Sequence, residues 1–132
     1  MTDRNLIDAA ADVKENSYSP YSRFRVGAAV ECADGTVFTG CNIENAAFGA
    51  TMCAEAAAIA SAVSAGKCNF KRIAIISDGS AYCFPCGTCR QILSEFSPDV
   101  EVLCARTDGR YVSYPLTTLL PMVFGKDQMG TQ

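Results

Sequence analysis

The sequence has no histidine among its 132 residues. This absence excludes a Ser-His-Asp triad, a Cys-His pair, an HExxH zinc helix and any proton shuttle that uses imidazole. Acid-base chemistry near neutral pH must then be carried by carboxylates, thiols, lysine or a water molecule that a metal ion makes acidic.

Positive charge is also scarce, because 11 lysines and arginines face 14 aspartates and glutamates, for a net charge of −3. Recognition of a phosphate backbone needs clustered basic residues, so we expect no nucleic-acid partner. No uninterrupted apolar run reaches the roughly 18 residues of a membrane span, and the first residues lack the apolar segment of a secretion signal. We therefore expect no membrane partner and a cytoplasmic location.

Eight cysteines have to be explained in that compartment, and they occupy positions 32, 41, 53, 68, 83, 86, 89 and 104. Cytosolic thiols stay reduced, and a chain of this size buries a core without covalent staples, so disulfide bonds are not expected. Isolated cysteines inside apolar runs, such as Cys104, are expected to behave as small buried hydrophobes. The dense cluster at 83 to 89 needs another explanation.

The length and the apolar fraction of 49% predict one domain over residues 1–132. Apolar periodicity and helix signals predict helices over residues 2–15, 53–66, 86–96 and 115–120. Apolar runs bounded by turn residues predict strands over residues 24–30, 36–41, 72–77, 100–105 and 110–114. This order indicates a single layered α/β unit, and the many alanines after position 53 allow close approach by a sheet or another helix.

Two of the predicted helix starts carry residues typical of a metal centre. The pair Cys86 and Cys89 opens one helix, and Cys53 opens the preceding one. Three thiolates suit zinc, and helix N-termini favour the thiolate form because they carry partial positive charge. A catalytic zinc keeps its fourth position for water, and Glu55 lies close enough in sequence to shuttle a proton beside it. Zinc deaminases use such a set: cysteine ligands, a glutamate that is not a ligand, and a Pro-Cys-x-x-Cys element.

Segments along nearly the whole chain resemble the cytidine deaminase family, in its small homotetrameric class. They are FRVGAA at 24–29, GCNIENA at 40–46, CAE at 53–55, PCGTCRQ at 85–91, and LLP at 119–121 followed by Phe124. The resemblance implies a three-layer α/β/α fold with a five-stranded mixed sheet, one zinc ion per chain and four subunits. It further implies hydrolysis of cytidine or deoxycytidine to the uracil nucleoside and ammonia.

The same resemblance assigns roles to individual residues. Zinc would be bound by Cys53, Cys86 and Cys89, while Glu55 would protonate N3, deprotonate the zinc water and protonate the leaving amine. Phe24 would lie against the pyrimidine, Asn42 and Glu44 would hold the ribose hydroxyls, and residues 48 and 124 would reach the site of a neighbouring subunit. The implied substrate-binding set is Phe24, Asn42, Glu44, Phe48, Ala54 and Phe124.

Two positions depart from the family pattern. Position 48 is Phe where the family often has Tyr, and position 56 is Ala where many members carry an Arg that offsets the thiolate charge. Either the site tolerates a more electron-rich zinc, or Arg90 supplies the compensation from just outside the ligand set, together with backbone N–H groups.

Two alternatives stay open on the sequence alone. Cys83 could be a fourth sulfur ligand, which would close the zinc site and leave a non-catalytic, zinc-stapled binding module. Deaminases of nucleoside antibiotics such as blasticidin S also lack Arg after Cys-Ala-Glu, although the segment from Asn42 to Asn45 favours a plain nucleoside.

Overall fold

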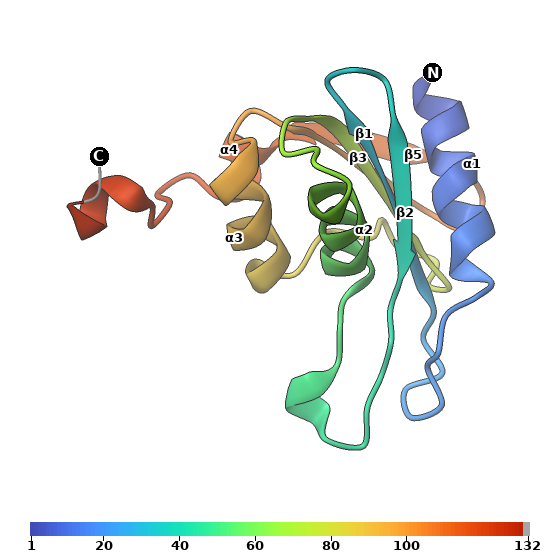
Figure 1. Ribbon diagram of the computed structural model, residues 1–132. Helices are drawn as coiled ribbons and strands as arrows, with labels where there is room; N and C mark the ends of the chain where they lie inside the picture. The colour runs from blue at the N-terminus through green and yellow to red at the C-terminus, as the bar shows by residue number, and fades with distance from the viewer. Residues whose placement is uncertain (131–132) are drawn as a thin grey trace.

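A five-stranded sheet separates the helices into two layers in the computed structural model, which describes residues 1–130 (Figure 1). The last two residues of the expected domain, 131 and 132, lie outside the described part. The strands are β1 (Val26–Cys32), β2 (Val37–Cys41), β3 (Phe70–Ser77), β4 (Glu101–Ala105) and β5 (Tyr111–Pro115). Their spatial order is β2-β1-β3-β4-β5, and β3 and β4 are the parallel pair, with Ala74 opposite Leu103. The expected mixed sheet is therefore confirmed.

The helices cover both faces of this sheet. They are α1 (Asp3–Lys14), α2 (Ala54–Ser64), α3 (Gly87–Phe96) and α4 (Leu116–Leu119), with 3-10 turns at Phe48–Ala50 and Lys126–Met129. In Figure 1, α1 lies on one side of the sheet and α2 and α3 lie on the other, which confirms the three layers. Among residues 1–130, none of the helices combines the length and the apolar character needed to cross a membrane.

The core consists of two apolar clusters, one on each face, because side chains alternate along the strands. On β1, Ala28 and Val30 face α2 and α3, whereas Ala29 faces α1. Helix α1 starts at Thr2, whose hydroxyl accepts the Asn5 N–H at 3.1 Å and caps the first turn. Helices α2 and α3 lie side by side on the same face of the sheet, and α3 begins with the cysteine pair Cys86 and Cys89.

Two glycines bring helices into direct contact with the strands. A Cβ added at Gly40 on β2 would lie within 3.0 Å of backbone atoms of Ala54 and Ala58 in α2. A Cβ added at Gly27 on β1 would lie as close to the Ala10 carbonyl oxygen of α1. The predicted close approach of the alanine-rich helix is thus to β2, and it sets the position of the start of α2.

The strand predicted from residue 24 begins two residues later, at Val26. Arg23 adopts a left-handed conformation with φ 56°, and the N–H groups of Phe24 and Arg25 donate to the side chains of Ser22 and Asp78, not to a neighbouring strand. The same strand continues past the predicted end at residue 30 to Cys32, because Glu31 pairs with Arg72 across to β3.

Candidate metal centre and active site

The three predicted thiol ligands converge where α2 and α3 begin. Cys53 is the N-cap of α2, Cys86 is the N-cap of α3, and Cys89 lies one turn further along α3. Their sulfur atoms all lie within 4.8 Å of one another, and the Cys53 and Cys86 sulfurs are 3.7 Å apart. Neither N-cap side chain hydrogen-bonds to its own helix, so both sulfurs remain available to a shared ion.

The spacing of the sulfurs fits zinc. A tetrahedral zinc with Zn–S bonds of about 2.3 Å places its sulfurs about 3.8 Å apart, close to the 3.7 Å between Cys53 and Cys86. Soft thiolates in a group of three match the preference of this ion. Cys89 is buried and Cys86 is exposed, so the group is closed on its inner side and open toward a cleft.

The electrostatics of the thiols favour a bound cation. A hydrogen bond with Cys89 lowers the pKa of Cys53 to about 6, although burial opposes this shift. The same hydrogen bond, together with burial, raises the pKa of Cys89. A divalent cation bound between the sulfurs would release their protons, because cysteine binds metal as the thiolate.

Glu55 lies beside this group in the first turn of α2 and is only 4% exposed. Burial raises the pKa of its carboxyl group, and the backbone N–H groups of Glu55 and Cys86 offset part of that shift. A carboxyl group with a raised pKa can both give and accept a proton nearer to neutral pH. Glu55 lines the same cleft as Cys53 and Cys86.

Cys83 does not join the three sulfurs, although it lines the same cleft. Burial raises the pKa of its thiol to about 11, and its side chain hydrogen-bonds to Ser77 at the end of β3. Among the described residues, the sulfurs that lie close enough to share one ion are those of Cys53, Cys86 and Cys89, without Cys83. An ion held by these three would keep its fourth position for another ligand.

The cleft has a volume of about 210 Å³. Of the predicted substrate-binding residues, Phe24, Asn42 and Ala54 line it. The Asn42 amide joins two of the segments, because its nitrogen donates to the Phe24 carbonyl at 2.8 Å and its oxygen accepts the Val26 N–H at 2.9 Å. The sequence analysis missed Thr51, Met52 and Phe84, which also line the cleft. For Phe84, the available signal was an aromatic residue directly before the Pro-Cys-x-x-Cys element.

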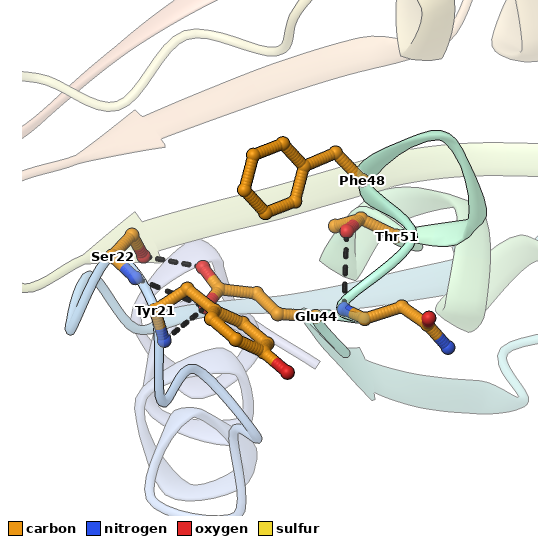
Figure 2. Close-up of a pocket in the computed structure, with 6 residues that line it drawn as sticks. Tyr21, Ser22, Glu44, Phe48 and Thr51 are labelled. Carbon is orange, nitrogen blue, oxygen red and sulfur yellow. Dashed lines mark hydrogen bonds between the residues drawn. The ribbon is translucent and has the colours of Figure 1, made fainter.

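A second cavity of about 340 Å³ adjoins the cleft, since Thr51 lines both (Figure 2). The Glu44 carboxylate accepts the N–H groups of Tyr21 at 2.9 Å and Ser22 at 3.1 Å, and also the Ser22 hydroxyl. That hydroxyl lowers the pKa of Glu44, so the group is ionised at neutral pH. Figure 2 shows the carboxylate turned toward the Ser22 turn, with the Phe48 and Tyr21 rings to either side.

Three predicted substrate-binding residues do not line the cleft, namely Glu44, which lines the second cavity, Phe48 and Phe124. Phe48 is 77% exposed and stands over the second cavity, with its ring centroid 6.2 Å from that of Tyr21. Phe124 is 59% exposed and lies beyond α4, where its carbonyl accepts a hydrogen bond from the Gln91 side chain at 2.7 Å. In Figure 1 this last part of the chain extends away from the sheet.

Arg90 lies on α3, and its hydrogen bonds go to backbone carbonyl groups. Its Nε donates to Pro85 at 2.8 Å, and its Nη1 donates to Leu119 at the end of α4, also at 2.8 Å. Arg90 thus fixes the peptide group that precedes Cys86, and through this peptide it influences the position of a proposed metal ligand.

The chain resembles known proteins along almost its entire length. Residues 1–105 match the family model described as the cytidine and deoxycytidylate deaminase zinc-binding region. A cytidine deaminase of Sporosarcina psychrophila is 39% identical, covering 98% of this chain and 96% of the relative. A cytidine deaminase of Halalkalibacterium halodurans is 40% identical, with 98% and 99% covered. The crystal structure of a cytidine deaminase from Burkholderia pseudomallei superimposes with a TM-score of 0.91 at 42% identity, covering 94% of this chain and 100% of that one.

Proposed function

The chain belongs to the family of cytidine and deoxycytidylate deaminases, and from this membership we propose that it hydrolyses the 4-amino group of cytidine and deoxycytidine. The products are uridine or deoxyuridine and ammonia. The observation that carries this proposal is the buried Glu55 carboxyl group, which shares a cleft with thiols spaced for zinc. The catalytic domain would comprise residues 1–132, and the reaction would serve pyrimidine salvage in the cytoplasm.

Zinc would be held by Cys53, Cys86 and Cys89, whose sulfurs have the required spacing. When bound, zinc supplies a Lewis acid that makes a water molecule acidic enough to act as the nucleophile. Glu55 accepts a proton from that water and delivers it to N3 of the pyrimidine as oxygen adds to C4. Glu55 then takes the proton of the new C4 hydroxyl group and passes it to the 4-amino group, so that the C4–N bond breaks, ammonia leaves and the C4 carbonyl forms. Glu55 carries much of the proton transfer, because the charge of three thiolates exceeds that of a divalent cation and makes the bound water less acidic.

The cleft would bind the base of the substrate, and the adjoining second cavity would bind its sugar. Phe24 lies in the cleft with Glu55, so the pyrimidine binds there, against the Phe24 ring and the Ala54 wall. The ribose then extends past Thr51 toward Asn42 and Glu44, whose polar groups suit its hydroxyls. An ionised Glu44 in this position repels a phosphate group on the sugar, so a free nucleoside is favoured over a nucleotide.

The decisive assay follows the ultraviolet absorbance of cytidine, deoxycytidine, cytidine monophosphate and blasticidin S with the purified protein. We expect turnover of the two free nucleosides and a much lower kcat/KM for the monophosphate. Preferential turnover of blasticidin S would replace the proposed substrate. Bound zinc with no turnover of any of the four would favour the non-catalytic binding module.

The variant Glu55→Gln tests the proposed proton transfer, because the amide has nearly the same shape and cannot exchange a proton. We expect unchanged zinc content and Tm, with kcat lower by at least ~10²-fold, the usual contribution of a positioned acid-base group. The control is Glu95→Gln, which changes an exposed carboxylate on α3 that pairs with Lys126. Turnover near that of the unmodified protein would reject the role of Glu55.

We also propose that four copies of the chain assemble. Phe48 and Phe124 are large exposed apolar side chains, and each lies outside the cleft of its own chain. Contact with a neighbouring copy would bury both and bring them toward that copy's cleft.

A further inference from the structure

An ion pair outside the cleft fastens the segment that carries Phe24. Asp78 directly follows β3, and Arg25 directly precedes β1. The Asp78 carboxylate accepts the Arg25 backbone N–H at 3.1 Å, its Nε at 2.8 Å and its Nη2 at 3.1 Å, and the Asp78 N–H donates back to the Arg25 carbonyl at 3.0 Å. Four hydrogen bonds thus join two residues at neighbouring strand ends.

These bonds leave Phe24 little freedom. On one side Arg23 holds a left-handed conformation, and the Phe24 N–H donates to the Ser22 hydroxyl at 3.0 Å. On the other side Arg25 is fixed by Asp78. The ring lies against the next residue of the same loop, since a Cβ added at Gly79 would be 3.4 Å from Phe24 Cε1. The loop that begins with Asp78 therefore restrains Phe24 in two ways. Asp78 fixes the backbone of the neighbouring Arg25, and Gly79 lies against the Phe24 ring.

Asp78 itself does not line the cleft. Its carboxylate is 27% exposed, and Lys14 Nζ lies 3.2 Å from its Oδ1. The partner guanidinium of Arg25 also contacts Glu15 at 3.1 Å. The effect of Asp78 on a ligand must therefore pass through Arg25, Gly79 and Phe24, and not through contact with the ligand.

We propose that Asp78 is a positioning residue that fixes the Phe24 ring as the wall against which the substrate pyrimidine binds. The inference rests on the proposed deaminase function for its kinetic consequences. A wall that contacts the bound substrate and the transition state alike lowers KM more than it raises kcat. Loss of the clamp should therefore appear mainly in KM.

The kinetic test is Asp78→Asn, which keeps the shape of the side chain and removes its charge. We expect KM for cytidine to rise roughly tenfold with a smaller change in kcat. This effect is smaller than the ~10²-fold loss of rate that a 1 Å misplacement can cause. In a Phe24→Ala background the same change should have little further effect, because coupled residues are not additive. Full additivity with Phe24→Ala would overturn the proposal.

The matched control is Asp34→Asn. Asp34 also accepts from a basic side chain, Lys67 Nζ at 2.6 Å, and from a backbone N–H, that of Thr36 at 2.9 Å. It lies beyond the opposite end of β1, so its loss should change Tm and leave KM unaltered. If Asp78→Asn does not fold, Arg25→Lys keeps the charge, breaks the paired hydrogen bonds and gives the same comparison.

A second readout does not depend on deaminase activity. The chain contains no tryptophan, so Phe24→Trp introduces a single indole at the wall. We expect acrylamide to quench its fluorescence more strongly when Asp78→Asn is added, and not when Asp34→Asn is added. Equal quenching in the two double variants would overturn the proposal, even if cytidine proves not to be a substrate. An inactive parent protein that shows the expected difference in quenching would reject only the proposed function.

Discussion

The three thiols of the metal centre differ in exposure, and this difference sets its open side. Cys89 in the first turn of α3 is buried, Cys53 is half-buried, and Cys86 is exposed at the cleft. Reagents from solvent therefore reach the centre past Cys86, on the side where Glu55 and Phe24 also lie. The cleft therefore gives access to the metal centre and is also the place where we propose that the substrate binds.

Replacing single cysteines should distinguish the proposed zinc ligands from Cys83, the thiol that lies near them. We expect Cys86→Ser to weaken zinc binding by more than the ~10–100-fold typical of a residue outside the ligand set. Cys83→Ser should leave zinc affinity unchanged, because the Cys83 thiol bonds to Ser77 and lies outside the sulfur group. Competition with a chelator, followed by elemental analysis, measures both. Equal losses would make Cys83 a fourth ligand.

Asp78 should also make stability depend on pH. The hydrogen bond from Arg25 holds the pKa of Asp78 at about 2, below the ~3.9 of an unfolded aspartate. The folded protein therefore binds fewer protons between these values, so the stabilisation is complete above about pH 4 and is lost as the pH falls toward 2. We expect Asp78→Asn to lower Tm at neutral pH, with the difference vanishing in this acid range. Thermal melts followed by circular dichroism measure it, and a difference independent of pH would contradict it.

The residues that the sequence revealed are those whose chemistry is local. Cys86 and Cys89 are three positions apart, and Glu55 follows Cys53 by two, a spacing typical of metal ligands, while the alanine-rich run after Cys53 and Pro85 before Cys86 indicated helix starts. The partnership of Asp78 with Arg25 joins positions 53 residues apart. No local pattern reports such a pair, because it exists only after β1 and β3 have paired.

Among the elements, every predicted helix and strand is present, and the differences lie at their ends. Strand β1 begins at Val26 because the Arg25 N–H bonds to Asp78 instead of a neighbouring strand. The periodicity of apolar residues predicts which segments are helices and strands, but polar contacts made in three dimensions decide where each one begins.

Helix α3 depends on Arg90 for the position of its first residues. This side chain joins the Pro85 carbonyl, just before Cys86, to the Leu119 carbonyl at the end of α4. We expect Arg90→Ala to weaken zinc retention and activity by ~10–100-fold, as for other losses next to a ligand set. Metal competition and kcat/KM for cytidine measure the two effects.

The control for this variant is Arg110→Ala. Arg110 is 75% exposed, and its ion pair with Asp108 is long, at 4.0 Å. We expect no change in zinc retention or activity. If Arg90→Ala also changes nothing, helix ends and backbone amides suffice to balance the thiolates, and Ala56 needs no compensating arginine.

For the whole molecule, the proposed assembly should be visible in solution. Light scattering is expected to give four times the chain mass, and Phe124→Ala is expected to weaken the assembly, because an exposed aromatic loses the pocket that would bury it. The control Met129→Ala removes another exposed apolar side chain from the last described turn. A fully active monomer would contradict the proposed fourfold assembly.

The contact between Gly40 and α2 also determines how the molecule tolerates change. The helix that carries Cys53 and Glu55 rests on the strand backbone, with no side chain in between. The spacing between the sheet and this helix is therefore set by main-chain atoms, and rotamer changes elsewhere in the core do not alter it. We therefore expect the active-site geometry to be retained when core side chains such as Val30 and Ile75 are exchanged for others of similar volume.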